Sequence, residues 1–191
     1  MSNALIALHF QNDICHPDGS IPFALDRSGE AAQRFLAASG AMLARARRAG
    51  WTIAHVHIAF ASDYSDLPRN CRLFNAVEKL GAVKRGSWGA AAFAGFEPAE
   101  QELSLIHACN NAFHGTGLDL LLRQRDVERL CVMGLATQFS VEHSVRHAAD
   151  LGYFVTVARD CCASADLEAQ QASFKTMAML ADVRGSEEIG F

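Results

Sequence analysis

Apolar runs of strand length alternate with helical patterns along this chain, and that alternation restricts the possible fold more than any other feature. The apolar runs lie at 4–9, 51–60, 103–107, 128–136, 153–160 and 181–185. Helical patterns with one apolar face lie between them, at 28–50, 118–125, 140–152 and 166–180. Strands that alternate with helices form parallel sheets whose two faces are covered by those helices. We therefore expect an α/β fold of three layers.

The longest helical pattern has residues that favour helix termini at both of its ends. Ser28 is a suitable N-cap, and Gly50 suits the left-handed position after the last turn. Residues 61–103 are different, because glycines and prolines are spread through them without a clear period. We expect a long excursion with short helices there, and such excursions inside compact domains are often functional.

Composition restricts the partners and the compartment. The chain has 191 residues, half of them hydrophobic, so we expect one domain over residues 1–191. Its 17 basic and 21 acidic residues give a net charge of −4, which argues against nucleic acid as a partner. We find neither a signal-peptide pattern nor an apolar run of about eighteen residues, so we expect no membrane partner. The six scattered cysteines form no CxxC pair and fit reduced thiols in the cytoplasm.

Three polar residues stand where a parallel sheet places its ligands. Such sites lie beyond the carboxyl ends of the strands. His9 ends the first strand, His107 ends the third, and Ser140 opens the helix after "CVMGLATQF". These three residues are distant in sequence, yet the fold can bring them together. We therefore expect a small-molecule site formed by His9, His107 and Ser140.

Four segments in order resemble one known family. "LHFQNDIC", "KRGSWGAAAFAGFEP", "HACNNAFHGTGLD" and "GLATQFSVEHSVRHAADLGY" are similar to conserved stretches of the isochorismatase-like, or cysteine hydrolase, superfamily. The resemblance covers nearly the whole chain. It implies a Rossmann-like domain with a six-stranded, mostly parallel sheet between helices. It also implies a homo-oligomer, a dimer or a tetramer.

The same resemblance implies a catalytic site in which this chain departs from its relatives. Amide-cleaving members use an aspartate, a lysine and a cysteine, and His9, His107 and Ser140 stand at those three positions. Backbone N–H groups beside a cis peptide between Leu135 and Ala136 would form the oxyanion hole. The flanking residues implied for the substrate pocket are Gln11, Trp88, Asn111, Phe113 and Thr137.

The replaced triad leaves several functions open. The leading one is hydrolysis of a small amide, ureide or related carbonyl compound by a non-cysteine mechanism, with Ser140 or a histidine-activated water as the nucleophile. The rival is a catalytically silent binding or regulatory protein on the same scaffold. We expect no cofactor, although His9 and His107 could bind a transition metal. Nicotinamidase is disfavoured, because Ile58 and Phe60 occupy the places of its metal-binding Asp and His.

Overall fold

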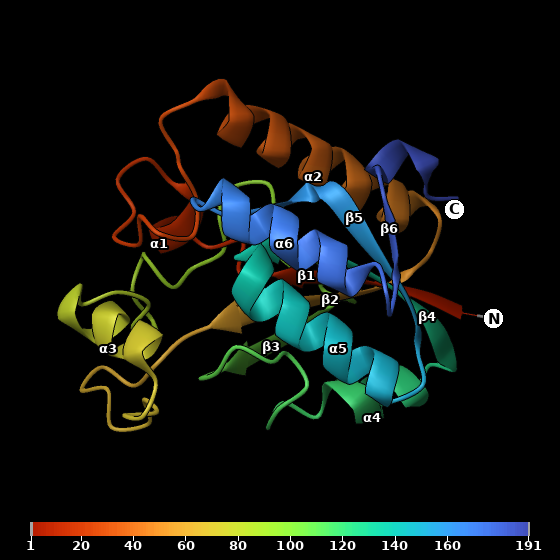
Figure 1. Ribbon diagram of the computed structural model, residues 1–191. Coiled ribbons are helices and arrows are strands. Elements are labelled where there is room, and N and C mark those ends of the chain that lie inside the picture. Colours follow the sequence, from red (N-terminus) through yellow and green to blue (C-terminus); the bar gives the residue numbers. More distant parts are fainter. Residues whose placement is uncertain (1, 191) are drawn as a thin grey trace.

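A parallel sheet forms the centre of the protein (Figure 1). The computed structural model describes residues 2–190. Six strands pair in the order β3-β2-β1-β4-β5-β6, and every described pair is parallel. The strands are β1 (Ser2–Leu8), β2 (Thr52–Ile58), β3 (Leu103–His107), β4 (Val127–Leu135), β5 (Phe154–Ala163) and β6 (Asp182–Arg184). The predicted six-stranded α/β fold is confirmed.

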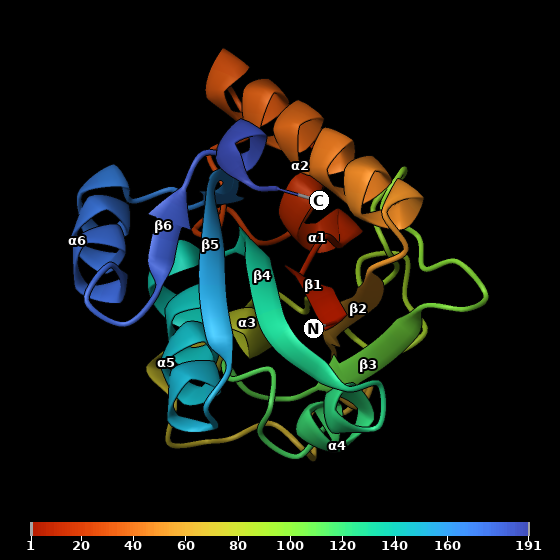
Figure 2. The same ribbon diagram turned by 90° about the vertical axis from the view of Figure 1, so that its right-hand side faces the viewer.

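Helices cover both faces of this sheet, as expected for a three-layer fold (Figure 2). The α-helices are α1 (Asn12–Cys15), α2 (Glu30–Arg48), α3 (Arg72–Lys79), α4 (Leu118–Arg123), α5 (Glu142–Asp150) and α6 (Leu167–Met177). Figure 2 shows α1 and α2 on one side of the sheet and α4, α5 and α6 on the other. A π-helix (Thr137–Val141) precedes α5, and a 3-10 helix (Ser186–Glu188) follows β6.

Alternating side chains of the central strand supply both halves of the core. Leu5 and Ala7 of β1 pack in the cluster beneath α2, whereas Ile6 and Leu8 pack in the cluster beneath α5 and α6. Every residue of Ala4–Leu8 is buried, because β1 lies between β2 and β4 with a layer of helices on each face. β1 is thus buried up to its last residue, Leu8, and the candidate site residue His9 follows directly.

The start of α2 corrects one expectation about helix ends. The helix begins at Glu30 with Gly29 as the N-cap, so Ser28 does not cap it. The hydroxyl of Ser28 instead donates to the carboxylate of Asp26 at 2.6 Å. Gly50 has the expected left-handed conformation, with φ of 70°.

The excursion between β2 and β3 contains one helix, α3, and loops that return to the sheet. Backbone bridges tie it down where Phe60 pairs with Lys84 and Gln11 pairs with Ala92. These bridges hold α3 beside the carboxyl ends of the strands, toward the left in Figure 1. Among residues 2–190, no helix is long and apolar enough to cross a membrane.

Candidate active site

Strands β1, β3 and β4 end at the same edge of the sheet and carry the candidate residues there. His9 follows β1, His107 is the last residue of β3, and Ala136 follows β4. Strand β2 lies between β1 and β3, so the two histidines meet across the end of β2. The backbone at His9 turns into the left-handed region, with φ of 61°, and its N–H donates to the carbonyl of Val56 on β2 at 2.9 Å.

The two histidine side chains form a buried pair. Their Nε2 atoms lie 2.6 Å apart and their ring centroids 4.9 Å apart. His9 is 3% exposed and His107 is 5% exposed. A contact this short between buried rings is a hydrogen bond, so one Nε2 carries the hydrogen and the other accepts it.

Neither histidine of this pair is charged at neutral pH. Burial lowers the pKa of His9 well below its ordinary value, and the neighbouring His107 lowers it further. Burial lowers the pKa of His107 to about 4. The charged form of an imidazole loses its hydration in this position, and no described carboxylate replaces that hydration.

The hydrogen-bonding partners assign a role to each nitrogen. His107 Nδ1 lies 3.2 Å from the carbonyl oxygen of Asn111, and the neutral tautomer that uses this contact carries its hydrogen on Nδ1. His107 Nε2 then accepts from His9 Nε2, which leaves a lone pair on Nδ1 of His9. The carbonyl of Leu135 raises the pKa of His9 and would receive a hydrogen from its charged form. His9 is therefore the member of the pair that can take up a further proton.

Ser140 lies in the π-helix that begins directly after β4. A cis peptide bond joins Leu135 to Ala136, and the carbonyl of Ala136 accepts from the N–H of Phe139 at 3.1 Å and of Val141 at 3.4 Å. Ser140 is buried, with 3% of its surface exposed. Its carbonyl accepts from the hydroxyl of Ser144 at 2.7 Å, so its position in the turn is fixed.

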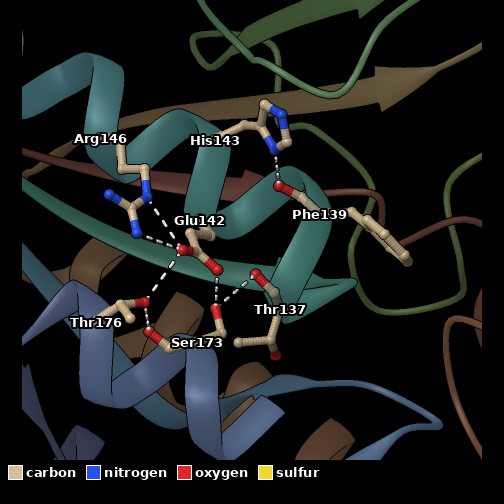
Figure 3. A network of polar contacts seen from close by, with 7 residues as sticks. All are labelled: Thr137, Phe139, Glu142, His143, Arg146, Ser173 and Thr176. Carbon is tan, nitrogen blue, oxygen red and sulfur yellow. Dashed lines mark hydrogen bonds and ion pairs between the residues drawn. The ribbon is translucent and has the colours of Figure 1, made fainter. Parts of the chain in front are cut away.

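A polar network attaches this π-helix and α5 to α6 (Figure 3). The carboxylate of Glu142 accepts from the hydroxyls of Ser173 at 2.6 Å and Thr176 at 3.1 Å, and Arg146 donates to it from the next turn of α5. Figure 3 shows Thr137 beside Ser173, on the same side as this carboxylate. Contacts from several elements thus determine where the turn that carries Ser140 lies.

His9, Ala136 and Ser140 open onto one small cavity of about 40 Å³. Its other walls are mostly apolar and come from the chain after β1, from the end of β2, from α3 and its neighbourhood, and from the π-helix. They are Ile14, Ile21, Phe23, Ala24, Ile58, Leu73, Phe74, Val77, Val83, Asn110 and Phe139. A volume of this size holds about three water molecules. The site is therefore suited to a small ligand.

The structure places Gln11, Asn111 and Thr137 in supporting positions, and none of the three lines this cavity. The amide of Gln11 donates to the carbonyl of Ile58 at 2.9 Å and accepts from its N–H at 2.8 Å, which fixes the end of β2. Asn111 holds His107 through its backbone carbonyl. The hydroxyl of Thr137 donates to the carbonyl of Ala163 at the end of β5, at 3.1 Å.

The two aromatic residues that the resemblance implied for the pocket also lie outside this cavity. Trp88 is 54% exposed and contacts the ring of His16, with centroids 5.0 Å apart. Phe113 packs on the opposite face of the sheet, against Tyr153 and His147. The walls come instead from apolar residues of loops, of the end of β2 and of α3, and the resemblance indicated none of them.

The histidine pair lacks the geometry of a pair of metal ligands. Its two Nε2 atoms are hydrogen-bonded directly to each other. The carboxylate of Asp13, four residues after His9, accepts from the backbone N–H of Ser20 at 3.1 Å and of Val83 at 2.7 Å. Within residues 2–190, no cluster of three or more histidine, cysteine, aspartate or glutamate side chains could hold a metal ion.

A larger groove, of about 590 Å³, lies at the opposite edge of the sheet. It is lined by residues near the starts of β4 and β5 and by the segment after α6, including Arg129, Phe154 and Met179. Ligands of open parallel sheets bind beyond the carboxyl ends of the strands, and this groove is at the amino ends. The smaller cavity at His9 is therefore the better candidate for an active site.

Comparison with known proteins assigns the chain to a family. Residues 3–188 match the Isochorismatase domain. The chain belongs to the isochorismatase family. An isochorismatase family protein from Desulfovibrio vulgaris has the same fold, with a TM-score of 0.85 and 29% identity over 97% of this chain and 95% of that one.

Two curated relatives show how this isochorismatase-family protein compares in sequence. The uncharacterized isochorismatase family protein YecD of Escherichia coli is 26% identical over 98% of this chain and 94% of its own length. The ureidoacrylate amidohydrolase RutB of Caulobacter segnis is 26% identical over 83% of this chain and 71% of its own length. The family and the fold are thus shown over nearly the whole chain.

Proposed function

We propose that this protein is a hydrolase of a small amide, ureide or related carbonyl compound, with His9 as the general base in place of a cysteine mechanism. One observation carries the proposal. A neutral His9, hydrogen-bonded to a neutral His107, opens onto the same small cavity as Ser140 and Ala136. Amidohydrolases among the relatives support the reaction class, since one of them is named for ureidoacrylate.

The proposed reaction begins with a water molecule in the cavity. Nδ1 of His9 accepts a proton from this water as its oxygen attacks the carbonyl carbon of the substrate. The resulting imidazolium donates Nε2–H to His107, and the carbonyl of Leu135 favours its charged form. His9 then returns the proton to the leaving nitrogen, so that the carbonyl compound and water yield an acid and an amine.

Ser140 and Ala136 stabilise this reaction from the other wall of the cavity. Within residues 2–190, no hydrogen bond joins the Ser140 hydroxyl to either histidine, which favours water over Ser140 as the nucleophile. The hydroxyl of Ser140 and the N–H of Ala136 are donors for the oxygen that becomes negative in the tetrahedral intermediate. A direct attack by Ser140 remains the second route of the same proposal, and mutation separates the two.

The test uses a panel of short amides and ureides with the variants His9→Gln, His107→Gln and Ser140→Ala. We expect His9→Gln to lower kcat/KM by about a hundredfold or more, because it removes the base. Ser140→Ala keeps measurable turnover if water attacks and loses all of it if Ser140 attacks. His114→Gln, which changes an exposed histidine outside the cavity, is the control.

Two outcomes would overturn the proposal. Turnover that survives His9→Gln unchanged would exclude His9 as the base. Absence of turnover across the whole panel, together with tight binding of one of its compounds, would instead support a silent binding or regulatory protein on this scaffold.

A further inference from the structure

The cavity at His9 has no group of fixed charge in its walls. Apart from His9, Ser140 and Asn110, its lining consists of apolar side chains. Among these described lining residues there is no lysine, arginine, aspartate or glutamate. Asp13 is the acidic residue nearest to His9 in the sequence. It is buried, and its carboxylate accepts from the backbone N–H groups of Ser20 and Val83.

His9 does not supply the missing charge. Its pKa is held far below neutrality by burial, so the imidazole stays uncharged over the pH range in which the base must work. An ionised ligand group in this cavity would therefore lose its hydration without gaining an ion pair. The lining therefore penalises ionised ligand groups that find no ion pair, and it favours apolar groups.

We propose that the substrate is an uncharged carbonyl compound with a short apolar group, and that carboxylate-bearing amides are excluded. This inference rests on the proposed hydrolase function of the same site. It separates the chain from the relative named for ureidoacrylate, a compound that carries a carboxylate. A shared scaffold therefore does not imply a shared substrate.

The size of the cavity narrows the substrate further. A volume of about 40 Å³ holds about three waters, so the cavity takes the carbonyl group and only the start of a short chain, and the rest of a ligand lies at its mouth. The carbonyl lies near His9, Ala136 and Ser140, and the apolar group lies against Ile21, Leu73 and their neighbours.

The first experiment compares two amides of matched shape. Isovaleramide and malonamate differ only where an isopropyl group replaces a carboxylate. Binding to the wild-type protein is measured at neutral pH by ligand-observed NMR, independently of turnover. We expect isovaleramide to bind about a hundredfold more tightly, because malonamate must bury an unpaired charge.

The second experiment places a cation at the wall of the cavity. Leu73 and Asn75 both lie on α3 and both are half-buried, but only Leu73 lines the cavity. Leu73→Lys should raise malonamate affinity about tenfold and lower isovaleramide affinity, through a charge that the wild type lacks. Asn75→Lys adds the same charge to the same helix and should leave both affinities unchanged.

The outcomes separate this inference from the proposed function. Malonamate that binds the wild type as tightly as isovaleramide overturns the inference, even if the protein hydrolyses amides. Failure of isovaleramide to bind at millimolar concentration also overturns it. Isovaleramide that binds in preference but is never hydrolysed supports the ligand class and contradicts the hydrolase function. If Leu73→Lys and Asn75→Lys change the malonamate affinity by the same factor, the cavity does not select the ligand and the inference is overturned.

Discussion

Mild acid should destabilise this protein because its sheet edge buries several histidines. Burial lowers the pKa of both His57 and His107 from 6.5 to about 4. In the unfolded chain both return to about 6.5, so the unfolded state binds more protons between these two values. The neutral folded forms of His57 and His107 contribute their full stabilisation above about pH 6.5, the pKa of the unfolded chain. This contribution decreases as the pH falls toward about 4. The experiment therefore compares the free energy of unfolding at about pH 7.5 with its value at about pH 5.

The two pKa values determine the size of the loss. At about pH 5 each unfolded histidine is almost fully protonated while its folded form is not, which costs about 2 kcal/mol per group. His57 and His107 together should lower the free energy of unfolding by about 4 kcal/mol. The pKa values of His9 and His55 are lowered in the same direction and add to this loss. Ordinary carboxyl groups remain mostly ionised at about pH 5, so the loss reflects the histidines.

Urea denaturation followed by circular dichroism at both pH values measures this loss. His57→Gln removes one of the titrating groups and leaves the pair of His9 and His107 intact, so the acid-dependent loss should shrink by about 2 kcal/mol. A wild-type loss below about 1 kcal/mol would refute the reasoning from burial. An unchanged loss in His57→Gln would show that His57 is not neutral in the folded protein.

Three further changes should alter stability by amounts that the structure indicates, each measured by urea denaturation. Gly89→Ala should cost about 1–3 kcal/mol, because the new Cβ would lie 2.0 Å from the carboxylate of buried Asp13. Gly40→Ala, in α2 with no atom within 4 Å of the new Cβ, should stabilise by about 0.5–1 kcal/mol, and a loss would contradict this reasoning. Ser173→Ala removes the 2.6 Å hydrogen bond to Glu142 and should cost about 1.5 kcal/mol. A cost near zero would show that the network in Figure 3 does not hold α5 on α6.

The helices and strands were predictable from the sequence because each must bury one face in the core, and this burial sets the spacing of its apolar residues. The run at 103–107 coincides with β3, and the longest helical pattern contains α2. The boundary near 140 was not predictable. There the chain forms a π-helix before α5, and contacts of Glu142 with α6 accompany that turn. Apolar spacing reports which face is buried, and it does not report how the backbone hydrogen bonds run within a turn.

The site was only partly predictable for a similar reason. Strand ends placed His9 and His107 at one edge, but the 2.6 Å contact across β2 depends on the left-handed backbone at His9. The apolar walls from Ile21 to Ala24 lie in an irregular segment, and α3 is a short helix inside the long excursion, so no clear period marked either of them. Phe113 shows the converse, since the resemblance implied a pocket wall there and the residue packs in the core on the opposite face.

The uncharged histidine pair and the apolar cavity are consistent with each other. An aspartate and a lysine bring fixed charges into a site, whereas the His9 and His107 pair is uncharged at neutral pH. A neutral pair can be buried against Ile58 and Phe139 without the desolvation cost of two unpaired ions. In the proposed reaction it can still accept one proton, because the carbonyl of Asn111 accepts from His107 and the carbonyl of Leu135 favours the charged form of His9. In the proposed reaction the site would be charged only while His9 holds the proton, which suits the uncharged substrate that we propose.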